Sequence, residues 1–357
     1  EDTRYGATQT FSNAVSVVTT AIGSGAVTSS GSVSASSLTS PKGRGIYVVE
    51  VAKLDSTSTP PGAPLLTNSG TKIWGYTYAD NSAMTFSIPG EVSALDTDYD
   101  GYVDRLYLGD TGGNIWRFNV SSSSTASWTA RKIFGANPGS GGSTDVGRKI
   151  FYKPSVSYEI GYQMLFFGTG DREHPLNWYD ATLNPFRDRM YGIKDKDSDQ
   201  TTTVVEDHTD NVHELVDVTD NYLQACATDC SQLNSILSNL DTLFGWYIKL
   251  DQDFTVDGIG YSGEKVLAPA LVFNKVAYYT TYAPSTTIPA DPCDPGNLGV
   301  GSLYAVDYKT GEAVINYDTT NTSDGTNTRS VSSEGQALLR SDRKMTLGSG
   351  IPSGIVV

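Results

Sequence analysis

The most informative residues of this sequence are nine consecutive positions in which aspartate alternates with other residues. They read Asp96-Thr97-Asp98-Tyr99-Asp100-Gly101-Tyr102-Val103-Asp104. Alternation brings the first three carboxylates to one side of a tight turn, and Gly101 can adopt the positive φ that reverses the chain around an ion. The pattern matches the first three quarters of an EF-hand calcium loop. It predicts a Ca²⁺ site whose ligands are the carboxylates of Asp96, Asp98, Asp100 and Asp104 and the backbone carbonyl of Tyr102.

Electrostatics explain why such a loop favours a cation. Two carboxylates about 5 Å apart repel each other by roughly 3 kcal/mol at an effective dielectric constant of about 20. A divalent hard cation removes this repulsion, and calcium accepts mixed carboxylate, carbonyl and water ligands more readily than magnesium does. A solvated acidic turn between strands is the alternative, because Asp-Gly pairs are frequent in turns. The completeness of the spacing favours calcium.

The loop departs from an EF-hand at its end. Tyr107 stands where the bidentate glutamate would be, and residues 105–109 alternate like a strand instead of continuing as a helix. We therefore expect a calcium loop carried by a β-hairpin, with an affinity in the sensor or extracellular range.

Composition favours a soluble, β-rich fold with many turns. The chain has 357 residues, with 36 glycines, 21 tyrosines and only 18% charged residues. Its formal net charge of −15 argues against a nucleic-acid partner. No apolar run approaches the roughly 18 residues that cross a membrane, so we expect no membrane-spanning segment. The sequence starts at Glu1 without a signal-peptide pattern, and we expect a processed product or a fragment.

Several segments have the period-two pattern of strands, and small-residue turns join some of them into hairpins. In the segment 106–120, Trp116, Phe118 and Val120 are expected to face one side. Repeated hairpins of this kind are typical of propellers with four-stranded blades. The predicted strands and hairpins are 43–51, 72–77, 106–120 with a turn at 110–114, 163–168, 245–250, 266–282 with a turn at 274–275, and 301–315 with a turn at 308–311.

One region differs from this pattern. Leucines and an isoleucine at spacings of three and four predict a helix within residues 220–243. With the polar stretch before it, the segment 171–244 is interpreted as an insertion between strands. Residues 1–40 are rich in Ser and Thr and are expected to be peripheral. We expect one domain over residues 1–357.

The three cysteines leave alternatives open. They are Cys226, Cys230 and Cys293. A local disulfide between Cys226 and Cys230 is the leading interpretation for an extracellular protein, and a metal pair or unrelated thiols are the alternatives. A zinc site would need two more ligands, and the spacing of His208 and His213 matches no zinc pattern.

Other acidic or glycine-rich segments are weaker candidates. The aspartate triplets 195/197/199 and 251/253/257 lack the glycine of a calcium loop, so solvated loops are favoured. The segment Gly168-Thr-Gly-Asp-Arg-Glu-His174 is interpreted as a strand-end turn, because no Gly-Lys-Ser/Thr follows it. His174 is expected to be structural or exposed. The five tryptophans are expected in the core more than on a ligand platform.

The chain resembles the PilY family of type IV pilus tip adhesins and biogenesis factors over about residues 40 to 357. The calcium loop runs directly into Gly-Asp-Thr-Gly-Gly-Asn-Ile-Trp-Arg-Phe118, which is the most specific part of the likeness. Gly43–Tyr47, Leu165–Gly170 and Gly301–Gly311 also carry it. The resemblance implies an all-β, modified β-propeller of mostly antiparallel four-stranded blades, with Ca²⁺ bound at Asp96, Asp98, Asp100, Tyr102 and Asp104.

The resemblance also implies a function and a location. The family acts in adhesion and in pilus extension and retraction, in complex with minor pilins at the fibre tip. We therefore expect a non-enzymatic protein on the cell surface, exported through the periplasm and outer membrane, that contacts a host or abiotic surface. Calcium could be a conformational switch or a structural clip. The alternative is a quinoprotein-like propeller oxidoreductase, because residues 303–311 also resemble blades of quinone-dependent dehydrogenases.

Overall fold

The computed structural model describes most of the chain from residue 43 onward. The described residues are 43–51, 53–55, 63–65, 70–137, 147–179, 186–196, 204–206, 215–219, 231–250, 254–256, 259–286, 298–315, 317, 338 and 340–356. Predictions for residues 1–40, for the three cysteines and for Asp197, Asp199, Asp251, Asp253 and Asp257 fall outside these ranges and stay predictions.

The chain forms two compact units. Unit 1 comprises Glu1–Pro89, Ala94–Leu106 and Arg117–Arg131, and unit 2 comprises Gly90–Ser93, Tyr107–Trp116 and Lys132–Val357. Some strands contribute residues to both units, so the single domain expected from the sequence stays a prediction.

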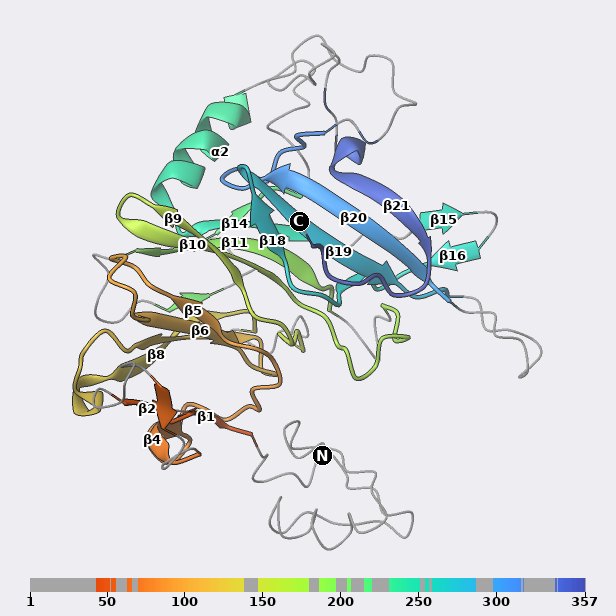
Figure 1. The fold of residues 1–357 in the computed structure, drawn as a ribbon. Coiled ribbons are helices and arrows are strands. Elements are labelled where there is room, and N and C mark those ends of the chain that lie inside the picture. Colours follow the sequence, from red (N-terminus) through yellow and green to blue (C-terminus); the bar gives the residue numbers. More distant parts are fainter. Residues whose placement is uncertain are drawn as a thin grey trace, which may run out of the picture. The chain divides into compact units, whose positions relative to one another are not determined.

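The secondary structure is dominated by strands, and one α-helix occurs among the described residues (Figure 1). The strands are β1 Gly45–Val49, β2 Lys53–Asp55, β3 Ala63–Leu65, β4 Lys72–Thr77, β5 Ser93–Leu95, β6 Arg105–Gly109, β7 Asn114–Asn119, β8 Thr129–Gly135, β9 Ser155–Glu159, β10 Tyr162–Gly168, β11 Arg189–Lys196, β12 Val205–Glu206, β13 Val216–Asp217, β14 Gly245–Lys249, β15 Phe254–Val256, β16 Ile259–Tyr261, β17 Lys265–Val266, β18 Leu271–Phe273, β19 Val276–Ala283, β20 Val300–Asp307 and β21 Lys344–Ser349. The helices are α2 Ser231–Thr242 and the 3₁₀ turns η3 Thr125–Ser127 and η5 Ser341–Arg343.

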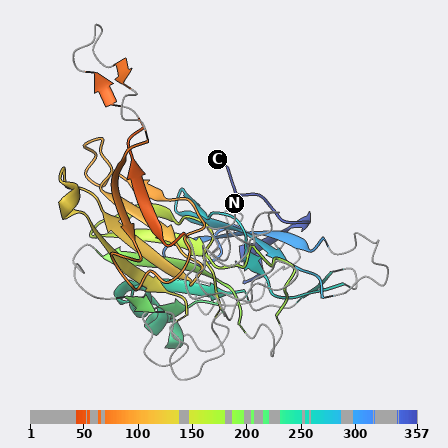
Figure 2. The same cartoon turned by 90° about the horizontal axis from the view of Figure 1, so that it is seen from below.

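Three sheets have the strand order of a propeller blade, in which neighbours in sequence are neighbours in space. In unit 2, β9, β10, β11 and β14 are paired antiparallel in that order, and β13 adds a short parallel strand (Figure 1). The strands β5 to β8 follow the same order, with β12 parallel to β8. The third sheet is antiparallel, with β17 and β18 on β19, then β20 and β21 (Figure 1). Figure 2 shows the same cartoon from below, with the strands of this sheet in cyan and blue. The predicted all-β, mostly antiparallel fold is confirmed.

The turn between β18 and β19 shows how local sequence sets the register. Asn274 and Lys275 both have positive φ, 48° and 66°, as a two-residue type I′ hairpin requires. Phe273 then pairs with Val276. The hairpin predicted at this position is therefore confirmed.

Two of these sheets enclose the core of unit 2. Met164, Phe166 and Trp246 of the first sheet are fully buried with Tyr279 and Val306 of the third. Burial of each large side chain contributes about 1.5–3 kcal/mol. The indole N–H of Trp246 donates to the carbonyl of Tyr308 at 3.0 Å, so the core carries no unpaired indole there.

Unit 1 has an aromatic core of its own. Trp74 of β4 makes edge contacts with Phe118 and Trp128, with ring centroids 6.2 and 5.2 Å apart. Tyr76 stacks on Trp74 at 6.0 Å. Trp74 and Tyr76 both lie on β4, which pairs antiparallel with β1. The acidic loop that follows β5 also belongs to unit 1.

The interpretation of residues 171–244 as one insertion is wrong for β11. This strand lies in the middle of the first sheet, paired with β10 and β14. Seven of its eight residues are buried, including Lys194 and Asp195, so its polar residues resemble a loop in the sequence. Asp195 is not part of a solvated loop, because it accepts a hydrogen bond from Tyr107 Oη at 2.6 Å. The connection between strands starts after β11.

That connection carries the helix α2, which lies inside the range 220–243 predicted to be helical. Two lysines of β11 bind its C-terminal carbonyls, which have no partner within the helix. Lys194 Nζ donates to the carbonyls of Leu240 and Asp241 at 2.6 and 3.1 Å, and Lys196 Nζ donates to Thr242 at 3.0 Å. Burial lowers the pKa of Lys194. No helix in the described part of the chain has the length and hydropathy of a membrane span.

We predict that Lys194→Met lowers the free energy of unfolding by about 2 kcal/mol, because two helix carbonyls lose a charged donor. Lys196→Met is the matched control and should cost clearly less, since its hydrogen bond is exposed. Urea unfolding followed by circular dichroism measures both. Equal losses in the two variants would contradict the role of Lys194 as the buried cap.

Candidate metal centre

The acidic loop 96–104 connects β5 to β6 and is organised by its own carboxylates. Asp96 Oδ1 accepts hydrogen bonds from the backbone N–H groups of Tyr99 and Asp100 at 2.6 and 3.2 Å, and Oδ2 accepts from Gly101 at 2.8 Å. Tyr99 and Gly101 have positive φ, 65° and 91°, so the chain wraps around Asp96. The glycine predicted to reverse the chain does so.

The loop brings three of the predicted ligands together. Oxygen atoms of Asp96, Asp98 and Asp104 lie within 4.8 Å of one another. Asp100 is outside this group, and its Oδ1 accepts from the N–H of Tyr102 at 2.8 Å. The Tyr102 side chain is exposed, as expected if only its carbonyl is used.

The donor chemistry of this group fits a hard cation. All three side chains offer carboxylate oxygens, and a pair of unit charges at this separation repels by about 3 kcal/mol at a dielectric constant of about 20. A carboxylate has about four lone-pair sites. Asp96 therefore keeps acceptor capacity beside its three N–H donors. Oxygen-only sites of this kind suit calcium.

Asp104 differs from the other acidic residues of the loop because it is buried and anchored. Its Oδ2 accepts hydrogen bonds from Thr97 N and Thr97 Oγ1, both at 2.7 Å. Its backbone N–H donates to Leu95 at 2.8 Å, and its carbonyl accepts from Val120 at 2.7 Å. The hydrogen bond from the Thr97 side chain is the largest cause of the lowered pKa of Asp104, and it outweighs burial. The buried carboxylate is therefore kept charged.

The sequence did not reveal the role of Asp110, which follows β6. This buried aspartate accepts hydrogen bonds at Oδ1 from Gly112 N and Asn114 N, at 2.8 and 3.0 Å, and at Oδ2 from Trp116 Nε1 at 2.8 Å. Asn114 Nδ2 reaches both oxygens. The spacing of Gly112, Asn114 and Trp116 after this aspartate was the only available signal. The motif 109–118 therefore fixes a hairpin turn and orients a core tryptophan.

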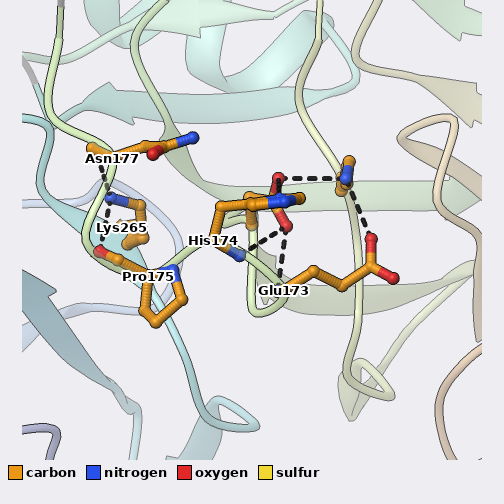
Figure 3. A network of polar contacts seen from close by, with 7 residues as sticks. Glu173, His174, Pro175, Asn177 and Lys265 are labelled. Atoms are coloured by element: carbon orange, nitrogen blue, oxygen red, sulfur yellow. Dashed lines mark hydrogen bonds and ion pairs between the residues drawn. The ribbon is translucent and has the colours of Figure 1, made fainter. Parts of the chain in front are cut away.

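A second acidic group lies on the turn after β10. Ligand atoms of Asp171, Glu173 and His174 lie within 4.8 Å of one another. Lys149 Nζ is 2.9 Å from Asp171 and 3.1 Å from Glu173, and His174 Nδ1 is 3.0 Å from Asp171 (Figure 3). Burial raises the pKa of Asp171, but its contacts with Lys149 lower it overall. An ammonium group already compensates these carboxylates, which makes this an ion-pair cluster.

Lys265 holds the same turn in place. Its Nζ donates to the carbonyls of Pro175 and Asn177 at 3.2 and 2.6 Å (Figure 3). It also donates to the carbonyl of Gly263 at 2.8 Å. This lysine is 3% exposed, and burial lowers its pKa. The half-buried Lys149 thus holds the strand-end turn predicted at residues 168–174, and the buried Lys265 holds the residues that follow it. The His174 side chain is exposed.

One comparison with known proteins covers the acidic loop. A family model for the PilY1 beta-propeller domain matches residues 85–223. A type IV pilus biogenesis factor PilY1 homolog of Xylella fastidiosa is 26% identical over 250 residues, which are 66% of this chain and 15% of that protein. The chain thus spans a small part of its curated relative.

Two solved structures show weaker likeness. The Pseudomonas aeruginosa PilY1 C-terminal domain aligns over 73% of this chain and 55% of its own, with 16% identity and a TM-score of 0.46. An α-L-arabinofuranosidase from Fusarium graminearum aligns over 72% and 58%, with 9% identity and a TM-score of 0.28.

Blade-like antiparallel sheets with an acidic loop between two strands define an all-β protein of propeller type. The family model and the curated relative support the likeness of this chain to the PilY family. The resemblance seen in the sequence is thereby confirmed.

We predict that Asp110→Ala lowers the free energy of unfolding by about 3 kcal/mol or more, because several buried donors lose their acceptor. Thermal and urea unfolding measure the loss. Glu91→Ala is the control, since Glu91 forms an exposed ion pair with Lys153, and its loss should change stability little. An Asp110→Ala protein as stable as the control would contradict the role assigned to Asp110.

Proposed function

We propose that this chain is a calcium-binding, non-enzymatic component of the type IV pilus machinery. The observation that carries the proposal is the convergence of Asp96, Asp98 and Asp104 inside the segment matched by the family model. The proposed ligands are the carboxylates of Asp96, Asp98, Asp100 and Asp104 and the carbonyl of Tyr102. Bound calcium would supply positive charge that offsets their mutual repulsion.

The position of the loop suggests what the ion would control. The loop joins β5 to β6 and its last aspartate is hydrogen-bonded to Val120, directly after β7. Filling the loop would restrict the ends of these strands. Calcium would therefore act either as a structural clip or as a switch that changes how this part of the protein meets a partner.

The pilus role rests on the relatives. The Xylella fastidiosa protein is described as a type IV pilus biogenesis factor. By this likeness we propose a location at the pilus tip on the cell surface, minor pilins as partners, and a host or abiotic surface as the adhesion target. The net charge of −15 supports this against a nucleic-acid partner. Calcium binding would tune adhesion or the extension and retraction of the fibre.

Calcium removal is predicted to destabilise the protein. A ligand present at about 100 times its Kd adds about 2.7 kcal/mol to the free energy of unfolding, so EDTA should lower the Tm of the wild-type chain. Asp98→Ala should abolish this difference and the heat of calcium binding, while its Tm in EDTA stays near wild type because Asp98 is exposed. Differential scanning and titration calorimetry measure both.

Glu91→Ala serves as the control here, because it removes one carboxylate of the same chain outside the loop. It should bind calcium like the wild type. Unchanged calcium affinity in Asp98→Ala would refute the ligand assignment.

In cells, Asp98→Ala placed in the full-length protein should alter the number of surface pili and twitching motility, because the loop can no longer be filled. Electron microscopy of pili and motility zones measure the effect, with the protein level checked by immunoblotting. If a variant shown to have lost calcium binding has wild-type piliation and motility, calcium does not regulate the pilus. The ion would then have only the role of a structural clip.

A further inference from the structure

The two ends of the acidic loop are linked to each other by Thr97 and Asp104. Both the backbone N–H and the hydroxyl of Thr97 donate to Asp104 Oδ2 at 2.7 Å, across seven positions of the chain. These hydrogen bonds between protein groups hold the two ends of the loop together.

Asp104 is the residue through which this end of the loop is attached to the sheet. Its backbone is hydrogen-bonded to Leu95 on one side and Val120 on the other, and the residue is 7% exposed. Asp98 and Asp100, in contrast, are exposed. The hydroxyl of Thr97 thus orients the one proposed ligand that is anchored to the sheet.

We propose that Thr97 is a positioning residue for the calcium site. It holds the Asp104 carboxylate in place and closes the loop before the ion arrives, so that binding does not have to order this ligand. Charge-assisted hydrogen bonds are strong enough for such a role, and groups that are ordered in advance raise affinity. The inference rests on the proposed calcium function.

The test compares two substitutions. Thr97→Val removes the hydroxyl but keeps the size, the β-branching and the backbone N–H, whereas Thr97→Ser keeps the hydroxyl. We expect Thr97→Val to weaken calcium binding by about tenfold, which corresponds to one lost hydrogen bond to a charged group. Thr97→Ser should stay within about twofold of wild type. Calorimetric titration of the full chain with calcium chloride gives the affinities.

The Tm in EDTA separates positioning from a purely structural role. If Thr97→Val lowers the Tm in EDTA but binds calcium like the wild type, the threonine is structural and the inference is overturned, while the calcium function stands. Equal weakening in Thr97→Ser and Thr97→Val also overturns it. Absence of calcium binding in the wild type overturns both. If Thr97→Val does not fold, Thr97→Ala against Thr97→Ser gives the same comparison.

Discussion

The proposed site depends on one constraint, which is the closing of an acidic loop against the repulsion of its own carboxylates. Three aspartate side chains lie within 4.8 Å of one another, and backbone N–H groups turned inward by Tyr99 and Gly101 offset part of their charge. The hydroxyl of Thr97, near the start of the loop, donates a hydrogen bond to Asp104 at its end. The backbone of Asp104 is hydrogen-bonded to the backbone of Leu95 and of Val120. The sheet therefore holds this end of the loop in place. A divalent cation would complete this balance of charge, which is why the loop is assigned to calcium.

Local patterns predicted a large part of the fold. Period-two alternation located most of the long strands, and Asn274-Lys275 marked a two-residue hairpin, because both signals depend only on residues close in the sequence. The acidic loop could be predicted for the same reason. The spacing of its aspartates and the position of Gly101 determine the local turn, so the convergence of Asp96, Asp98 and Asp104 follows the sequence prediction. Asp100 is outside that group. Its Oδ1 accepts a hydrogen bond from the backbone N–H of Tyr102 instead.

Features that depend on partners far away in the chain could not be predicted. The strand β11 contains Lys194 and Asp195, and only the helix end and Tyr107 that they contact explain why such residues are buried. Asp110 resembled a turn residue, although its buried hydrogen bonds to Asn114 and Trp116 determine the hairpin. The pairing of Thr97 with Asp104 needs the three-dimensional turn as well. In each case a polar residue is buried because a specific partner satisfies it.

The proposed function requires that the loop 96–104 binds one calcium ion through its aspartates. A crystal structure of this chain grown with calcium, with anomalous scattering data, tests it most directly. We expect one ion peak in contact with carboxylate oxygens of Asp96, Asp98 and Asp104. A well-ordered loop without an ion at saturating calcium would contradict the account.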